Sequence, residues 1–192
     1  MQIVSADVGF KRLAVMATLM VSLAYASDYD EPHLLSMARE TIISQVRGTP
    51  LNHVLMGKLP VKPVFVTIER DGVIRGCRGS LTTRTTSLED EIRLAARGAA
   101  GHDPRYRPLS EKESWNFQVT ITIVEGKEKI SGVSGLRPQD GLALESGGHW
   151  GIVLPWEGKD PATRLKWAYQ KAGVAQGAPA SLFRLTATRF RG

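Results

Sequence analysis

Two apolar runs flank a turn in the stretch Val64-Phe-Val-Thr-Ile-Glu-Arg70-Asp71-Gly72-Val73-Ile-Arg-Gly-Cys77. Both runs are rich in β-branched residues, and Asp-Gly between two such runs is typical of a two-residue hairpin turn. The stretch therefore predicts an antiparallel β-hairpin. An antiparallel sheet then becomes the centre of the fold.

The hairpin turn also predicts which face of the sheet carries Cys77. Strict alternation from the turn places Cys77 opposite Val66, on the same face as Arg75. Glycines lie close to the cysteine on both sides, at Gly76 and Gly79. They favour a bend or a β-bulge, either of which would break the alternation at this point.

The remaining elements follow from periodicity and from end signals. A helical apolar pattern begins at Pro32 and ends at Gly48, a second pattern has capping-box spacing at Thr86 and Glu89, and a third begins at Asp160 and ends at Gly173. Alternating residues predict strands at about 117–124, 142–146, 149–154 and 182–190. The sequence thus predicts an α+β fold, with an antiparallel sheet built from hairpins and packed by about three helices.

The N-terminal residues 1–26 have the pattern of a secretory signal peptide. Lys11-Arg12 precedes the apolar run 13–24, which is shorter than the roughly 20 residues that cross a bilayer, and Ala24-Tyr25-Ala26 suits a signal peptidase. We expect cleavage between Ala26 and Ser27 and export to the periplasm or the medium. The alternatives are an uncleaved anchor and a buried N-terminal helix.

The mature chain is then a single domain of residues 27–192 with no stable membrane span. The full chain of 192 residues has a formal charge of +6, and removal of residues 1–26 takes away Lys11, Arg12 and Asp7 and leaves +5. The positive residues are spread along the chain, with no Lys/Arg-rich run and no nucleic-acid-binding motif. We therefore expect an anionic partner other than nucleic acid, such as a small acidic ligand.

The chain has one cysteine and four histidines. A single cysteine cannot form an intramolecular disulfide, so the thiol of Cys77 is predicted to be free. The histidines are not spaced as metal ligands usually are: they are His33, His53, His102 and His149. We expect neither a metal ion nor another cofactor.

Several segments in a fixed order resemble a known family. They are Pro63-Val-Phe-Val-Thr67, Arg75-Gly-Cys-Arg-Gly-Ser80, Asp103-Pro-Arg-Tyr-Arg-Pro-Leu109, the strand 117–124, residues 151–155 and Lys171-Ala-Gly173. The chain is similar, from about residue 34 to 190, to the AMME chromosomal region candidate (AMMECR) family, whose bacterial and archaeal members are called AmmeMemoRadiSam system protein A. Arg-Gly-Cys-x-Gly is the most specific of these segments.

The resemblance implies a compact α+β domain with a smaller lobe and no established biochemical activity. It also implies Memo-like and radical-SAM partners, which similar proteins often accompany. The chain departs from the family pattern at Arg78, where an apolar residue is usual, and in its export signal. If the chain is exported, it leaves the reducing compartment that a radical-SAM iron–sulfur cluster needs.

Two interpretations of Cys77 remain open. As a functional thiol it is a nucleophile or a carrier, activated by nearby arginines and backbone N–H groups, with His102 or His149 as the base. As a structural residue it is a small core side chain. Three aromatic residues are interpreted as core or rim side chains rather than as a ligand-stacking set: Trp150, Trp156 and Trp167.

An arginine on an apolar face needs a carboxylate or an anionic ligand to offset its desolvation. For Arg75, the candidate partners are Asp103 and Glu145. Arg75 and Arg105 each have two alternatives, an internal ion pair with a carboxylate or a bond to an anionic ligand. The predicted site comprises Cys77 and His102 as catalytic residues, and as binding residues Arg75, Gly76, Gly79, Asp103, Arg105, Glu145 and His149.

Two functions are consistent with this set of residues. One is a Cys77-dependent enzyme or covalent carrier that acts on a small acidic or carbonyl substrate. The other is a binding module that presents a cleft around the Arg-Gly-Cys-Arg-Gly motif to a small anion or a partner protein. We favour the binding module, because spacing alone identifies no complete set of nucleophile, base and orienting residue.

Overall fold

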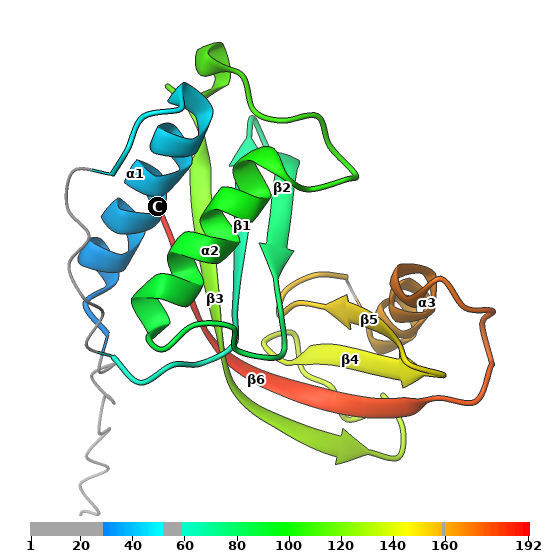
Figure 1. The fold of residues 1–192 in the computed structure, drawn as a ribbon. Helices are drawn as coiled ribbons and strands as arrows, with labels where there is room; N and C mark the ends of the chain where they lie inside the picture. Colours follow the sequence, from blue (N-terminus) through cyan, green and yellow to red (C-terminus); the bar gives the residue numbers. More distant parts are fainter. Residues whose placement is uncertain (1–28, 52–58, 159) are drawn as a thin grey trace, which may run out of the picture.

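The structure, a computed structural model, describes residues 29–51, 59–158 and 160–192 (Figure 1). Within these ranges, six strands form one antiparallel sheet in the order β2-β1-β3-β6-β4-β5. The strands are β1 (Val64–Arg70), β2 (Val73–Gly79), β3 (Gln118–Ile130), β4 (Gly141–Ser146), β5 (His149–Val153) and β6 (Ser181–Arg191). The helices are α1 (Glu31–Arg47), α2 (Leu88–Gly101) and α3 (Pro161–Ala172), with a 3₁₀ turn η1 at Glu111–Glu113. The predicted α+β class is confirmed.

The helices begin and end at side chains that satisfy their free backbone groups. Asp30 accepts a hydrogen bond from His33 N at the start of α1, and Asp160 accepts one from Thr163 N at the start of α3. Gly48 and Gly173 end these two helices in the left-handed conformation.

The capping box predicted at Thr86 and Glu89 is wrong. Ser87 is the N-cap of α2, and its hydroxyl accepts a hydrogen bond from Asp90 N. The Glu89 carboxylate instead accepts hydrogen bonds from the backbone N–H of Leu59, a residue distant in sequence. The Glu89 side chain therefore forms a tertiary contact instead of the predicted capping box.

The helices lie at two ends of the sheet (Figure 1). Helices α1 and α2 pack together over one face of β1 and β3, and their apolar residues form the larger core with Val66 and Ile68. Helix α3 packs on β4 and β5 and forms a second, smaller core. The long strands β3 and β6 run through both parts and join them (Figure 1).

The face of β1 opposite to α1 and α2 is turned toward the smaller part. Phe65 lies on this face and packs in a third cluster with Ala143 of β4, Leu154 and Leu185 of β6. Cys77 packs against the same cluster. The register of β3 and β6 shifts between Val124 and Gly126, where β3 passes from one part to the other.

The hairpin β1–β2 begins in the predicted register, but the predicted face of Cys77 is wrong. Arg70 pairs with Val73, and a bulge beyond this pair places Cys77 opposite Thr67 instead of Val66. The cause is Gly76, which lies under α2, where a Cβ atom would be 2.0 Å from the carbonyl oxygen of Ala99. Only glycine fits against the helix, so position 76 takes the helix face and Cys77 takes the other.

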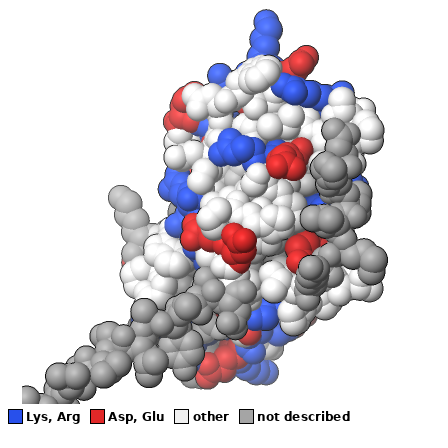
Figure 2. Space-filling model, turned by 90° about the vertical axis from the view of Figure 1, so that its left-hand side faces the viewer, with Lys and Arg blue, Asp and Glu red and all other residues white. Residues whose placement is uncertain are grey.

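Charges of both signs are interspersed on the face that carries α1. Figure 2, turned so that this face is toward the viewer, shows Lys and Arg side chains next to Asp and Glu side chains. Among the residues described, no helix is both long and apolar enough to cross a bilayer.

Candidate functional site

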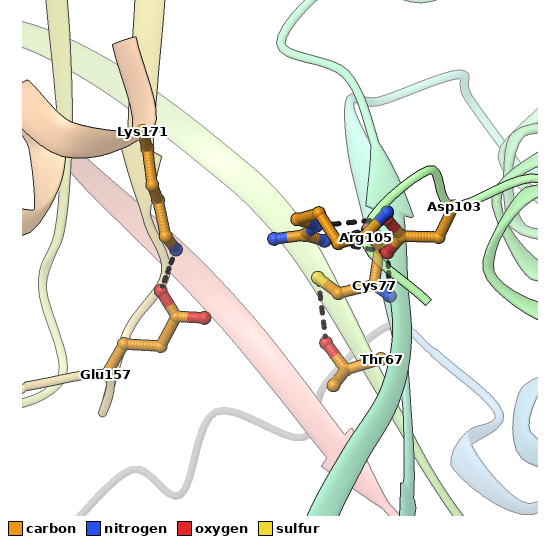
Figure 3. Close-up of polar contacts among 6 residues, drawn as sticks. All are labelled: Thr67, Cys77, Asp103, Arg105, Glu157 and Lys171. Atoms are coloured by element: carbon orange, nitrogen blue, oxygen red, sulfur yellow. Dashed lines mark hydrogen bonds and ion pairs between the residues drawn. The ribbon is translucent and has the colours of Figure 1, made fainter. Parts of the chain in front are cut away.

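Cys77 lies half-buried near the end of the edge strand β2, and three polar contacts surround it (Figure 3). The hydroxyl of Thr67 donates a hydrogen bond to Sγ at 3.2 Å. The backbone N–H of Cys77 donates to Oδ2 of Asp103 at 2.8 Å, and its carbonyl accepts from Nη2 of Arg105 at 2.8 Å. The exposed edge of β2 is thus paired by two side chains, much as a neighbouring strand would pair it.

Buried Asp103 and the more exposed Arg105 form a tightly bonded pair. Nε and Nη2 of Arg105 donate to the two carboxylate oxygens at 2.9 and 2.7 Å, and Arg105 N adds a third bond at 3.1 Å. Burial opposes ionisation of Asp103, but the hydrogen bonds from Arg105 and from Cys77 N outweigh it and lower the pKa of the carboxyl. The pair therefore stays ionised and fastens the loop after α2 to β2.

Burial raises the pKa of the Cys77 thiol, and the nearby carboxylate of Glu157 raises it further. The hydrogen bond from Thr67 and the charges of Lys171 and Arg105 lower this pKa, but they do not offset the burial. Cys77 is consequently a neutral thiol near pH 7 rather than a thiolate.

A second ion pair faces Cys77 from the smaller part of the molecule (Figure 3). Nζ of Lys171, on α3, lies 2.6 Å from Oε2 of Glu157, which also accepts from the backbone N–H of Leu154 at 3.0 Å. This pair joins α3 to the segment after β5 and forms the wall opposite to Asp103 and Arg105.

Two adjoining cavities, of about 430 and 730 Å³, lie between these walls. We call them together the cleft. Both are lined by Cys77, Arg105, Leu154, Trp167 and Lys171. The first extends over Thr67, Thr120 and Thr122 to Trp156 and Arg189, and the second extends between β2 and β5 to Gly79, Asp103 and Trp150.

Trp156 and Arg189 were not predicted as site residues from the sequence. The guanidinium of Arg189, on β6, lies over the indole of Trp156, with its Cζ 5.2 Å from the ring centroid. Trp156, Trp167 and Trp150 are 47%, 37% and 42% exposed and all line the cleft, so these residues are rim aromatics. The sequence contained a signal for Arg189, because the strand pattern from 182 to 190 alternates and gives this arginine a defined face.

The predicted site residues divide between the cleft and other places. Cys77, Gly79, Asp103 and Arg105 line the cleft. Arg75, Gly76, His102, Glu145 and His149 line neither cavity. Gly76 is covered by α2, as described above.

The prediction that Arg75 pairs with Asp103 or Glu145 is wrong. At the bulge, Arg75 turns to η1, where Nε and Nη2 donate to Oε1 of Glu113 at 3.0 and 2.8 Å. Glu145 instead accepts a hydrogen bond from Gly148 N in the β4–β5 turn. Arg75 thus holds an internal ion pair, because the bulge rotates it out of the face that strict alternation assigned to it.

Neither candidate base lies in the cleft. His102 ends α2 as its C-cap and lines a separate cavity with Arg78 and Gly98, while His149 is exposed at the start of β5. In the part of the chain that the structure describes, no histidine lines the two cavities next to Cys77. The described residues also include no cluster of three or more metal-ligating side chains, and His53 lies outside them.

The chain matches the family model AMMECR1 over residues 35–192. It is 33% identical over 132 residues to a protein of Thermotoga maritima, covering 66% of this chain and 76% of the relative. It is 34% identical over 164 residues to a protein of Aeropyrum pernix, covering 77% and 70%. Its fold is similar to the crystal structure of an uncharacterized protein from Pyrococcus horikoshii, with a TM-score of 0.69, 27% identity and coverage of 84% and 90%. The chain therefore belongs to the AMMECR1 family.

Proposed function

We propose that this AMMECR1 domain is a binding module that holds a small organic molecule in the cleft. The observation that carries the proposal is the cleft itself, which combines two adjoining cavities of about 430 and 730 Å³ with exposed indole rings at its rim. Ligand sites of proteins have this size range and this mixture of apolar walls with a few placed polar groups.

The contacts of Cys77 favour binding over covalent catalysis. A nucleophile in acyl transfer commonly supplies its own backbone N–H to the oxyanion, but the N–H of Cys77 is already bonded to Asp103. The described residues of the cleft supply no histidine as a base, and burial keeps the thiol neutral. In this proposal Cys77 is a wall contact for the ligand.

A competition experiment tests the proposal. Compounds from a diverse set of small organic acids, amides and amines should slow the alkylation of Cys77 and quench the fluorescence of Trp167, since both side chains line both cavities. The proposal fails if no compound changes either signal at millimolar concentration.

Two tryptophan variants provide matched controls for this competition. Trp167→Ala removes a ring that both cavities share, so it should weaken protection of Cys77 by roughly tenfold or more. Trp115→Ala removes a ring that is 73% exposed, contacts Arg47 and lines neither cavity, and it should leave protection unchanged.

We also propose that the domain works after export. The order of Lys11-Arg12, the short apolar run and Ala24-Tyr25-Ala26 supports it, and the range matched by the family begins at residue 35, after the proposed cleavage site. N-terminal sequencing of protein recovered from outside the cytoplasm should start at Ser27. An intact chain in the cytoplasm would instead favour the Memo-like and radical-SAM partners that the family resemblance implies.

A further inference from the structure

Arg189 differs from Arg105 and Lys171, the other cations that line the first cavity, because it has no anionic partner. It is half-buried on β6, opposite Thr122 of β3, and it lines the first cavity. Among the residues that the structure describes, its guanidinium has no hydrogen-bond or ion-pair partner, and it stacks on the indole of Trp156. Removing an arginine from water without a partner is unfavourable, so its position calls for an explanation.

The other charges around the first cavity compensate one another. Arg105 is paired with Asp103 and Lys171 with Glu157, as Figure 3 shows, and Arg191 is paired with Glu69. Arg189 is therefore the surplus cation in the first cavity. Burial and the nearby charge of Arg191 lower its pKa, with Glu69 partly offsetting them, so the surroundings of the guanidinium do not stabilise its charge.

The residue that supports Arg189 has a strained backbone. The Glu157 N–H donates to the Leu154 carbonyl across Pro155 and Trp156, and Trp156 has φ +64°. A type II turn with proline at its second position needs such a φ at the third, where glycine is usual. A tryptophan there is disfavoured, and residues held in this way concentrate at functional sites.

The backbone of Trp156 is held from the inside of the molecule. Its N–H donates to the carbonyl of Pro138 at 2.8 Å, and the same carbonyl accepts from Nη2 of the buried Arg164 at 3.2 Å. These bonds hold the backbone that carries the indole, and the indole lies against the Arg189 guanidinium. The edges of the guanidinium, which carry its N–H groups, stay available for a ligand.

A second polar group without a partner lies in the wall of the same cavity. Thr120, two residues from Thr122 on β3, is 4% exposed, and its buried hydroxyl has no hydrogen-bond partner among the residues described. Thr67, its cross-strand neighbour, donates to Cys77 instead. A buried hydroxyl normally has a partner, so Thr120 is a second unpaired polar side chain at the first cavity.

We propose that Arg189, stacked on Trp156, is the anion subsite of the cleft, and that its ligand is a small monocarboxylate whose remaining part is apolar or aromatic. This inference rests on the proposed function. A carboxylate matches the guanidinium fork with two parallel hydrogen bonds and neutralises one surplus charge. A phosphate monoester carries nearly two negative charges at neutral pH and would leave an excess negative charge in the first cavity. The surrounding apolar residues, Ile74, Leu154, Pro155 and Trp167, suit the rest of such a ligand.

The test compares benzoate, benzamide and phenyl phosphate, with protection of Cys77 from alkylation and calorimetry as the two readouts. Benzoate should bind at least about tenfold more tightly than benzamide, which has the same ring without the charge, and phenyl phosphate should bind no more tightly than benzoate. Arg189→Gln should remove the preference for benzoate. Arg184→Gln on the same strand, which removes an ion pair to Glu128 and lines neither cavity, should retain it.

Two further variants separate a folding defect from the loss of the subsite. Arg189→Lys keeps the charge without the planar fork and should bind benzoate with intermediate affinity. Trp156→Gly relieves the strained φ, so it should unfold at no lower temperature than the wild type while it binds benzoate more weakly.

The outcomes distinguish this inference from the proposed function. If benzamide protects Cys77 as well as benzoate does, or if Arg189→Gln binds benzoate like the wild type, the carboxylate subsite is wrong and the binding cleft remains. If benzoate does not bind at millimolar concentration, the inference is also wrong. If no compound of the wider set protects Cys77, both proposals fail.

Discussion

At the scale of the residue, Cys77 shows how a single hydrogen-bond pattern decides a chemical role. Its backbone groups are occupied by Asp103 and Arg105, and its thiol accepts from Thr67. Of the arginines around it, Arg75, two residues before Cys77, is paired with Glu113, and Arg105, which the fold brings to Cys77, is paired with Asp103. The charges of these two guanidinium groups are neutralised by carboxylates rather than directed at the thiol.

We predict that Cys77 reacts slowly with iodoacetamide in the folded protein near pH 7. Because its pKa is raised by burial, the thiolate fraction is smaller than that of a free thiol at the same pH, and the rate should climb only at alkaline pH. The rate is measured against pH, with N-acetylcysteine as the reference and with denatured protein as the control for access.

The Cys77→Ser variant should fold, with a loss of roughly 1 kcal/mol or less, because the hydroxyl can keep the bond to Thr67. Rapid labelling near pH 6, together with the loss of a ligand modification in Cys77→Ser, would contradict the binding proposal and favour the covalent alternative.

At the scale of the element, the two edge strands of the sheet are covered by helices in the same way. Gly76 of β2 lies under α2, and Gly151 of β5 lies under α3, where a Cβ atom would be 1.8 Å from the carbonyl oxygen of Ala168. In both places the obstacle is backbone, which cannot rotate away as a side chain can. These two contacts set the distance of α2 and α3 from the sheet.

Gly76→Ala and Gly151→Ala should each destabilise the protein by about 3 kcal/mol or more, since a whole helix has to shift. Gly132→Ala is the control, because a Cβ atom at Gly132 has no neighbour within 4 Å. Urea unfolding of the three variants measures the difference. Equal stabilities would show that α2 and α3 can move away from the strands at little cost.

Local patterns predicted the elements well, and non-local contacts explain the errors. The Asp-Gly turn, the C-cap of α1 at Gly48 and both caps of α3 depend on neighbouring residues, and the structure contains them where they were predicted. The bulge at Arg75 depends on α2, and the lost capping box depends on Leu59. Neither partner is visible in the local sequence.

At the scale of the whole molecule, the cleft exists because β3 and β6 carry one sheet through two parts. This arrangement brings β2 and β5, the two edges of the sheet, to opposite sides of one cavity. Cys77 and the Asp103 loop could be predicted as site residues, because they lie within the distinctive motifs. Trp156, Lys171 and Arg189 could not be placed beside Cys77, because their approach depends on the course of the entire sheet.

The wall that carries Arg105 is held to β2 by two buried carboxylates. Asp103 binds the edge of β2, and Glu113 of η1 binds Arg75 at the bulge. The hydrogen bond from the backbone N–H of Ser110 lowers the pKa of Glu113, and burial opposes this effect. The Ser110 hydroxyl and Arg75 lower the pKa further, and the result is about 2. The segment from 102 to 113 is therefore attached through groups that must be ionised.

We predict that acid loosens this segment before it disrupts the two helix-packed cores. Because the folded-state pKa of each carboxyl lies below its unfolded value, their stabilisation is complete above about pH 4.5 and is lost as the pH falls toward 2. For Glu113 the effect is on the order of 1–2 kcal/mol after solvent screening.

Glu113→Gln should be less stable than the wild type at neutral pH and should lose less stability between about pH 4.5 and 2. Glu111→Gln, in the same 3₁₀ turn but 71% exposed at its side chain, is the matched control and should follow the wild type. Urea unfolding across this pH range measures both variants. If Glu113→Gln loses as much stability on acidification as the wild type, protonation of Glu113 is not what loosens the segment.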